Sequence, residues 1–537
     1  MDKRNIYFSI IISLTLCIGI LLGNLYSKNA NSKGNSPVLP ENIDGYDKLS
    51  DVLNLLQQNY VDTIDKKKLE EDIISNMLKD LDPHSVYISK EEVTEANEDL
   101  EGSFSGIGVQ FNIQNDTVMI VNVIAGGPSE KVGLFAGDRS VEVNDSSFVG
   151  KSITNRKVLK TLRGEKGSKV KIGIKRKGQH NVLYYTVTRG DIPIHSVDVA
   201  YKINPVTGYI KVSQFGANTY KEFLTALVSL RRQNCKNIII DLRNNSGGYL
   251  SAVIQMTNEF LQADQLIVYT KGRKLPREDA PADGNGRFKN INVCVLINEW
   301  SASASEIFAG AIQDHDRGWI IGRRSFGKGL VQQQIPLRDG SELRLTVARY
   351  YTPSGRCIQK PYAKADEYEG EIQKRFLHGE FFQKDSTSFP DSLKFATDLG
   401  RPVYAKGGIM PDYFVGEDTS AYTTYYKKVM DLGIVYDFSF DYVDSNRKIL
   451  SQYKTWQDLS AYLNTTHYFE DFIRFAEKKK IKRNSKQIAK SKKLLENTLQ
   501  AFISRNVLGD SGFYPILNLQ DEVINKALEV VETPVRK

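Results

Sequence analysis

Ser303 and Lys328 are the two side chains in this sequence whose types and spacing could perform covalent chemistry. Ser303 lies in the stretch from Asn298 to Glu306, N-E-W-S-A-S-A-S-E, and Lys328 lies between Gly327 and Gly329. A serine hydroxyl becomes an effective nucleophile when a nearby base removes its proton, and an uncharged lysine can be that base. The pair is what a hydrolase of the serine-lysine type needs.

The surroundings of Ser303 favour this chemistry. The apolar run from Val293 to Ile297 predicts a strand, and Ile307 and Phe308 begin a helix, so Ser303 is expected in the first helical turn. The partial positive charge at a helix start favours negative charge that develops there during a reaction. The alternative is that Ser301, Ser303 and Ser305 are only capping hydroxyls, because serine is a preferred N-cap residue.

Lys328 has to be desolvated if it is to act as a base, because burial lowers the pKa of a lysine. The flanking glycines let the backbone close around it, and Phe326 supplies apolar cover. If residues 328–332 form a strand, Gln332 lies on the same face as Lys328, and its amide could orient the amine. The alternative is an ordinary surface lysine.

A third group of residues could stabilise an oxyanion. The stretch from Asp241 to Gly248, D-L-R-N-N-S-G-G, follows an expected strand through a glycine-rich turn. Backbone N–H groups of Gly247 and Gly248, together with that of Ala304, could point at a substrate carbonyl. Losing one such donor typically slows a reaction about 100- to 1000-fold.

Other chemistries have weaker support in the sequence. The stretch from Gly322 to Lys328 has the glycine and lysine spacing of a phosphate-binding P-loop, but Gly329 stands where a hydroxyl would hold Mg²⁺, and a strand follows instead of a helix. The four cysteines have no CxxC spacing and the six histidines include no HExxH. No metal, cofactor or disulfide framework is therefore expected.

The length of 537 residues exceeds what one hydrophobic core usually serves, and 41% hydrophobic and 25% charged residues are typical of a globular protein rather than a disordered one. The changes of pattern along the chain predict a multidomain α/β protein. Its expected parts are a signal anchor or transmembrane segment (1–28), a linker (29–42), an N-terminal helical module (43–100), a β-rich domain (101–190), an α/β core (191–416) and a C-terminal helical region (417–537).

The first part of the chain predicts the compartment. Lys3 and Arg4 precede an apolar run from about Ile6 to Gly23, which is roughly long enough to cross a bilayer. Positive charge at the start keeps that end in the cytoplasm, so the remaining chain is expected in the periplasm or extracytoplasmic space. A cleaved signal peptide is the alternative, although no small-x-small cleavage site follows the run.

Short β-branched runs and glycines mark the β-rich domain. Gly106, Ile107, Gly108 and Val109 precede one such run, and Gly126 to Ser129 opens a short helix. These features resemble a PDZ domain, in which Gly106 to Val109 would be the carboxylate-binding loop. The resemblance implies that a peptide C-terminus binds this loop while the peptide adds a strand to the sheet edge.

Taken together, the motifs resemble the C-terminal processing, or tail-specific, protease family. The resemblance runs from about Asp44 to Val415 and includes D-L-D-P-H-S from Asp80 and G-G-I-M-P-D from Gly407. It implies that Ser303 is the nucleophile, Lys328 the general base and Gln332 its orienting partner. It also implies an acyl-enzyme intermediate, no metal or cofactor, and protein substrates with accessible C-termini.

Two other functions are weighed against this one. A non-enzymatic PDZ adaptor on a protease-like scaffold would bind C-termini without turnover. Nucleic-acid binding would use the ten lysines and arginines between Arg474 and Lys493, which account for the net charge of +8. Interleaved apolar residues favour a solvated helical face there, so no nucleic-acid partner is expected. A homo-oligomer or an activating adaptor is possible, and the PDZ domain is expected to gate access to Ser303.

Overall fold

The computed structural model describes residues 47–114, 116–124, 126–176, 178–362, 365–383, 391–405 and 407–535. The signal anchor and linker predicted for residues 1–42 lie outside these ranges. The described residues divide into two compact units at the boundary between residues 72 and 73. No helix of the described ranges is long and apolar enough to span a membrane.

The described part of the first unit is helical, as predicted. It contains α2 (Lys48–Asn59), and α3 (Lys66–Lys79) begins in it and continues into the second unit. The carboxylate of Asp47 accepts hydrogen bonds from the N–H groups of Leu49 and Ser50, which caps the start of α2.

The second unit continues with a strand, a helix and a two-stranded ladder that lead into the β-rich domain. These elements are β1 (Val86–Ile88), α4 (Lys90–Glu101), β2 (Ser103–Gly106) and its antiparallel partner β9 (Gly190–Pro193). Since β2 enters the domain and β9 leaves it, this ladder connects the domain with the rest of the unit.

The β-rich domain is an antiparallel sheet in the order β3-β4-β5-β7-β8, with β3 at one edge. Alternating Val118 and Ile120, and likewise Val170, Ile172 and Ile174, bury one face of the sheet against α6. The elements are β3 (Val109–Gln114), β4 (Thr117–Val123), α5 (Pro128–Lys131), β5 (Arg139–Val143), β6 (Ser146–Ser147), α6 (Asn155–Leu162), β7 (Lys169–Lys175) and β8 (Leu183–Thr188).

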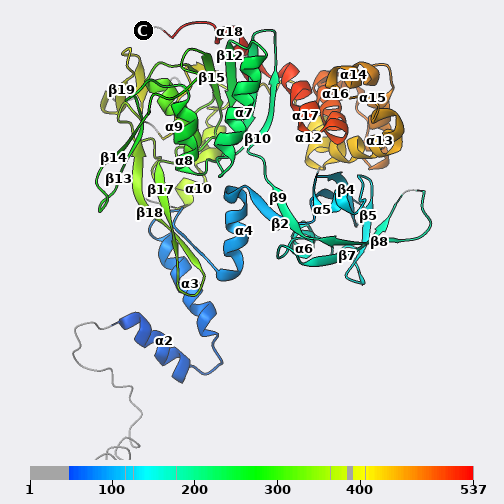
Figure 1. Ribbon diagram of the computed structural model, residues 1–537, viewed down its shortest axis with the longest axis horizontal. Coiled ribbons are helices and arrows are strands. Elements are labelled where there is room, and N and C mark those ends of the chain that lie inside the picture. The colour runs from blue at the N-terminus through cyan, green and yellow to red at the C-terminus, as the bar shows by residue number, and fades with distance from the viewer. Residues whose placement is uncertain are drawn as a thin grey trace, which may run out of the picture. The chain divides into compact units, whose positions relative to one another are not determined.

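The α/β core is built on a six-stranded sheet in the order β10-β11-β12-β15-β16-β21 (Figure 1). All neighbours are parallel except the β10–β11 pair. The strands are β10 (Val197–Lys202), β11 (Thr207–Val212), β12 (Asn237–Asp241), β15 (Asn292–Ile297), β16 (Trp319–Gly322) and β21 (Tyr413–Phe414).

Both faces of this sheet are buried, which explains its continuous β-branched runs. Ile238 and Ile240 of β12 face a core shared with α7 (Thr219–Arg232), α8 (Leu250–Asn258) and α9 (Ala304–Asp314), whereas Ile239 faces the opposite side. The opposite side is covered by α18 (Glu522–Val530), which comes from the far end of the chain.

A second, antiparallel sheet follows the order β1-β18-β13-β14, and β17 also pairs with β18. Its further strands are β13 (Leu266–Lys271), β14 (Glu278–Pro281), β17 (Leu330–Pro336) and β18 (Glu342–Tyr351). The smaller elements nearby are α10 (Ala365–Glu369), α11 (Glu371–Leu377), η1 (Asp391–Leu393), β19 (Lys394–Ala396) and β20 (Pro402–Tyr404).

The C-terminal region is helical, as predicted, but its parts pack differently. A separate apolar core holds α12 (Thr424–Asp431), α13 (Ile434–Leu450), α14 (Trp456–Leu463), α15 (Tyr468–Lys478) and α16 (Ser485–Leu508). Ile481 and Ile488 of the basic stretch, and Phe472 just before it, are buried in this core. Then α17 (Asp510–Leu517), η2 (Asn518–Gln520) and α18 return to the α/β core. The predicted multidomain α/β class is thus confirmed, and α18 covers one face of the core sheet.

Candidate active site

Ser303 lies in a strained turn at the start of α9. Its φ of 55° and ψ of −113° are unusual for a residue with a side chain, and such outliers are typical of functional sites. The hydroxyls of Ser301 and Ser305 are buried and donate to the carbonyl oxygens of Leu242 (2.8 Å) and Asn245 (2.8 Å). Two of the three serines therefore fix local structure, while Ser303 lines a cavity.

Lys328 lines the same cavity and is half-buried. Burial lowers the pKa of its amine, and the carboxylates of Glu306 and Asp82 partly oppose this shift. The flanking glycines are required by close backbone approach, as predicted: a Cβ on Gly327 would lie 2.8 Å from the Gly407 carbonyl carbon. Apart from its backbone, Lys328 makes no hydrogen bond or ion pair with the described part of the chain.

Glu306 ties the serine turn to the lysine loop. It is fully buried, and Oε2 accepts hydrogen bonds from the N–H groups of Ser303 (2.9 Å) and Lys328 (2.9 Å). Oε1 accepts from the Gly327 N–H (2.8 Å) and the Ser325 hydroxyl (2.5 Å). Burial raises the pKa of Glu306 to about 7, against the opposing effect of these four donors. The hydroxyl of Tyr350 adds a second link, because it lies within hydrogen-bond distance of the Ser303 and Lys328 carbonyl oxygens.

Gln332 lines the cavity, but its partner differs from the one expected. Its Nε2 donates to Thr346 Oγ1 (3.2 Å), which in turn donates to Asp82 Oδ1 (3.1 Å). Lys328 precedes β17, which begins at Leu330, and the pairing of β17 with β18 is irregular between Val331 and Gln332. The simple four-residue strand spacing assumed for Lys328 and Gln332 is therefore not present.

The turn from Arg243 to Gly248 places the Gly248 N–H group at the cavity. The N–H of Gly247 donates to Asn245 Oδ1 (2.9 Å), so it is already occupied. Phe215 bridges to this segment through Gly247 O (3.0 Å) and Tyr249 N (2.7 Å), which leaves the Gly248 N–H on the other side. Gly248 and Ala304 line the cavity, and their N–H groups have no acceptor in the described ranges.

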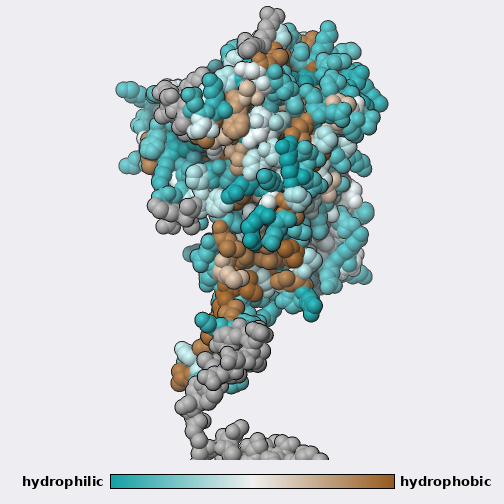
Figure 2. Space-filling model, turned by 90° about the vertical axis from the view of Figure 1, so that its left-hand side faces the viewer, coloured by the Kyte–Doolittle hydropathy of each residue, from teal (hydrophilic) through white to brown (hydrophobic). Residues whose placement is uncertain are grey.

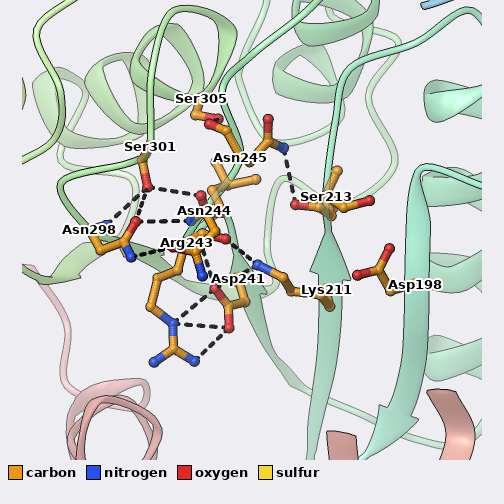
Figure 3. A network of polar contacts seen from close by, with 12 residues as sticks. Asp198, Lys211, Ser213, Asp241, Arg243, Asn244, Asn245, Asn298, Ser301 and Ser305 are labelled. Atoms are coloured by element: carbon orange, nitrogen blue, oxygen red, sulfur yellow. Dashed lines mark hydrogen bonds and ion pairs between the residues drawn. The ribbon is translucent and has the colours of Figure 1, made fainter. Parts of the chain in front are cut away.

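Side chains on either side of this turn hold it in place (Figure 3). Asn244 and Asn298 exchange two hydrogen bonds, of 2.9 and 2.8 Å. The amide of Asn245 donates to the Val212 carbonyl (3.0 Å). A Cβ on Gly247, where φ is 105°, would lie 2.7 Å from Ser303 Cβ. The turn and the serine thus pack so closely that only glycine fits between them.

The cavity measures about 320 Å³ and has a mainly apolar wall beyond the polar groups. Val86, Leu100, Leu250, Ile307 and Leu330 contribute to that wall. Figure 2 shows one face of the molecule as largely hydrophilic, with hydrophobic residues gathered in its lower part. The apolar part of the cavity wall can hold an apolar stretch of an unfolded polypeptide.

His84 adds an uncharged polar group to the cavity wall. Burial and the positive charge of Lys328 lower the pKa of His84 to about 4. Its Nε2 lies 2.6 Å from the Tyr368 hydroxyl. Asp82 fixes this segment by accepting from the N–H groups of His84 (2.8 Å) and Ser85 (2.9 Å).

The predicted carboxylate-binding loop connects β2 to the edge strand β3. Gly106 ends β2, and Val109 begins β3. The carbonyl oxygens of Ile107 and Gly108 accept from Ser129 N (3.0 Å) and Ile124 N (3.0 Å), and Gly108 has a φ of 74°. A loop with inward-turned carbonyls next to an edge strand of a sheet has the backbone arrangement that strand addition uses.

Four family models match the chain. The PDZ domain matches residues 105–184, and Peptidase family S41 matches residues 206–368. The N-terminal domain of the activating protease CtpB matches residues 23–92, and a family of unknown function matches residues 425–509.

Individual proteins extend the similarity. A probable CtpA-like serine protease of Staphylococcus haemolyticus is 32% identical over 384 residues, 71% of this chain and 69% of that protein. The chain belongs to peptidase family S41, the family of the C-terminal processing proteases. The carboxy-terminal processing protease CtpB of Bacillus subtilis is 35% identical over 317 residues, 58% of this S41 chain and 65% of that protein. The carboxy-terminal-processing protease of Bartonella bacilliformis is 36% identical over 319 residues, which are 58% of this chain and 72% of that protein.

Sequence reasoning missed two contributors to the site of this S41 protease. Glu306 is the fourth residue of S-A-S-E, a spacing that signals a capping box, so a local signal for it was present. The contact between Thr346 and Asp82 joins segments more than 260 positions apart, and no local pattern indicates it.

Proposed function

We propose that this protein is a serine endopeptidase that hydrolyses peptide bonds of proteins selected through their C-terminal tails. Ser303 would be the nucleophile and Lys328 the general base. The observation that supports this most is that Ser303, Lys328 and the N–H groups of Gly248 and Ala304, which have no acceptor among the described residues, line one cavity.

In the first half of the reaction, the uncharged amine of Lys328 takes the hydroxyl proton of Ser303 as Oγ attacks the scissile carbonyl carbon. The carbonyl oxygen becomes an oxyanion, to which Gly248 and Ala304 would donate their N–H groups. The ammonium of Lys328 then returns its proton to the leaving nitrogen. The C–N bond breaks, an amine product departs, and the acyl group stays on Ser303 as an ester.

In the second half, Lys328 takes a proton from water, and the hydroxide oxygen attacks the ester carbon. The C–O bond to Ser303 breaks, and the proton passes back to Oγ, so the enzyme is regenerated. The Gln332 amide already donates to Thr346, so its carbonyl oxygen would be the atom that accepts from the lysine ammonium. No metal or cofactor is needed for any of these steps.

The PDZ domain would capture the tail and gate the cavity. Arg163, at the end of α6, forms an ion pair with Glu98 of α4, and its guanidinium stacks 4.4 Å from the centre of the Phe104 ring. Leu100 of α4 also lines the cavity wall. A shift of the PDZ domain on peptide binding would therefore move α4 and change the shape of the cavity. Anchoring by residues 1–28, with catalysis outside the cytoplasm, completes the proposal.

The test uses the full-length protein in detergent with an unfolded, fluorescently labelled protein substrate. Wild type should release fragments, whereas Ser303→Ala and Lys328→Ala should lose activity by at least about 1000-fold. Turnover by either variant at the wild-type rate would reject the assignment. Peptide binding without turnover by the wild type would instead identify the adaptor.

Gating has a separate test in Arg163→Ala. The variant should change kcat for a substrate with a bound C-terminal tail and leave cleavage of a short internal peptide, which does not engage the PDZ domain, unchanged. Equal changes for both substrates would contradict gating.

A further inference from the structure

The segment that contains α18 is hydrogen-bonded near both of its ends to strands of the core sheet. At its start, Asn518 Nδ2 donates to the Tyr201 hydroxyl (2.9 Å) of β10. At its end, Asn237 Nδ2 donates to Glu532 Oε1 (2.9 Å), and Trp319 Nε1 donates to the Thr533 carbonyl (2.8 Å). These residues of the C-terminal region lie outside the part that matches the S41 family, residues 206–368.

Asp521 joins this helix to the turn that holds Gly248. Its Oδ1 caps α18 by accepting from the N–H groups of Val523 (2.9 Å) and Ile524 (3.2 Å). Its Oδ2 accepts from Arg243 Nη1 (2.7 Å). Arg243 and Asp521 are only 18% and 20% exposed, so solvent screens this pair weakly.

Arg243 is shared between two carboxylates. Its Nη2 and Nε donate to Asp241 Oδ2 at 2.6 and 3.1 Å, while Nη1 remains for Asp521. Lys211 Nζ reaches Asp241 Oδ1 (3.4 Å) and the Arg243 carbonyl oxygen. Two cations thus face two anions, and removing the charge of Asp521 would leave one positive charge in excess at a poorly solvated place.

The backbone of Arg243 begins the turn that presents the candidate oxyanion donor. Its N–H donates to Asp241 Oδ1 (2.9 Å), and five residues later the Gly248 N–H faces the cavity. Figure 3 shows the Arg243 side chain pointing away from the serine helix, on the side of the turn opposite Ser305. A displacement of Arg243 would therefore tilt the turn that carries the Gly248 N–H.

We infer that Asp521 is a positioning residue of the active site, which holds Arg243 and through it the Gly248 N–H, so that docking of the C-terminal helical region is coupled to catalysis. The inference rests on the proposed function. A positioning role affects the transition state rather than substrate binding, whereas a purely structural role affects stability alone.

The experiment compares three variants of the full chain. Asp521→Asn keeps an N-cap acceptor but removes the charge, and Asp521→Glu keeps the charge. Asn484→Ala serves as the stability control, because it removes the N-cap of α16, where Asn484 Oδ1 accepts from the Gln487 N–H (3.1 Å). We expect kcat of Asp521→Asn to fall about tenfold with KM within about twofold, less than the 100-fold or more lost with an oxyanion donor.

Asp521→Glu should recover most of kcat, and Asn484→Ala should lower the melting temperature without changing kcat. A peptide aldehyde, which forms an oxyanion on the serine, should bind Asp521→Asn more weakly by the same factor as kcat falls. Wild-type kcat in Asp521→Asn, or an equal loss in Asn484→Ala, would overturn the inference while the proposed function stands. Absence of Ser303-dependent turnover in the wild type would overturn both.

Discussion

Replacing Glu306 by glutamine should separate the organisation of the site from its charge. The carboxylate accepts two hydrogen bonds at each oxygen, from Ser303 and Lys328 at Oε2 and from Ser325 and Gly327 at Oε1. An amide has only one oxygen, so an NH₂ group must face two of these four donors. Two buried donors left without acceptors cost about 1–3 kcal/mol each, which predicts a loss of about 2–6 kcal/mol in the free energy of unfolding.

The same replacement should slow turnover and move its pH dependence. Ser303 and Lys328 lose a shared acceptor, so kcat should fall about 100-fold, as expected when reacting groups are misplaced by about 1 Å. The negative charge of Glu306 raises the pKa of Lys328, so its removal should lower that pKa. Because the base must be uncharged, the rising limb of the pH-rate profile should then shift to lower pH.

The measurement is urea unfolding combined with steady-state kinetics from pH 6 to 10, with Glu259→Gln as the matched control. Glu259 is buried and accepts from the Tyr220 hydroxyl (2.7 Å) and the Arg287 N–H (2.9 Å), remote from the reacting groups. The control should lose stability but keep kcat and the wild-type pH profile. If Glu306→Gln matches the control in kcat and in the position of the rising limb, the carboxylate does not organise the catalytic pair.

Three further predictions concern the same cavity. Gly247→Ala should lower kcat about 100-fold, because its Cβ would lie 2.7 Å from Ser303 Cβ; crystal structures and kinetics check this, and wild-type kcat would contradict it. For the wild type, kcat/KM should rise with pH through a pKa below that of an exposed lysine, because burial lowers the pKa of Lys328, and a profile that is flat from pH 6 to 10 would refute the lysine base. His84 has a pKa lowered from 6.5 to about 4, so between these values the unfolded state binds more protons and stability falls as the pH falls. His84→Gln should reduce that acid-induced loss by about 1–2 kcal/mol, after allowance for partial exposure, and an unchanged loss in calorimetry would show that His84 does not cause it.

The positions of the candidate nucleophile and base follow from local pattern. The strand ending at Ile297 and the helix beginning at Ala304 are both visible as apolar periodicities, so the place of Ser303 at their junction was predictable. The glycines beside Lys328 likewise indicated close backbone approach, which the structure shows at Gly407. Local signals sufficed there because each feature depends on residues within one turn or strand.

Choices between neighbouring atoms were not predictable in the same way. Sequence reasoning treated the N–H groups of Gly247 and Gly248 as equivalent donors, and only the side chain of Asn245 distinguishes them, by accepting from the first. The contact of Gln332 with Thr346 depends on an irregular pairing of β17 and β18. Such outcomes depend on side-chain geometry across strands, which spacing along one strand does not encode.

The candidate site is assembled from three segments, residues 243–248, 303–306 and 325–332, and buried hydrogen bonds link the second segment to each of the other two. In the first segment, Asn245 accepts hydrogen bonds from the Gly247 N–H and from the Ser305 hydroxyl. Glu306 of the second segment accepts from the N–H groups of Ser303 and Lys328, and so links the second segment to the third. Donors fixed in this way need little rearrangement when an oxyanion forms, which is the main source of catalytic electrostatics. The same connections mean that a displacement of one segment reaches the others. Contacts made from outside, by Asp521 at the first segment and by Asp82 through Thr346 at the third, therefore act on the complete site rather than on single residues.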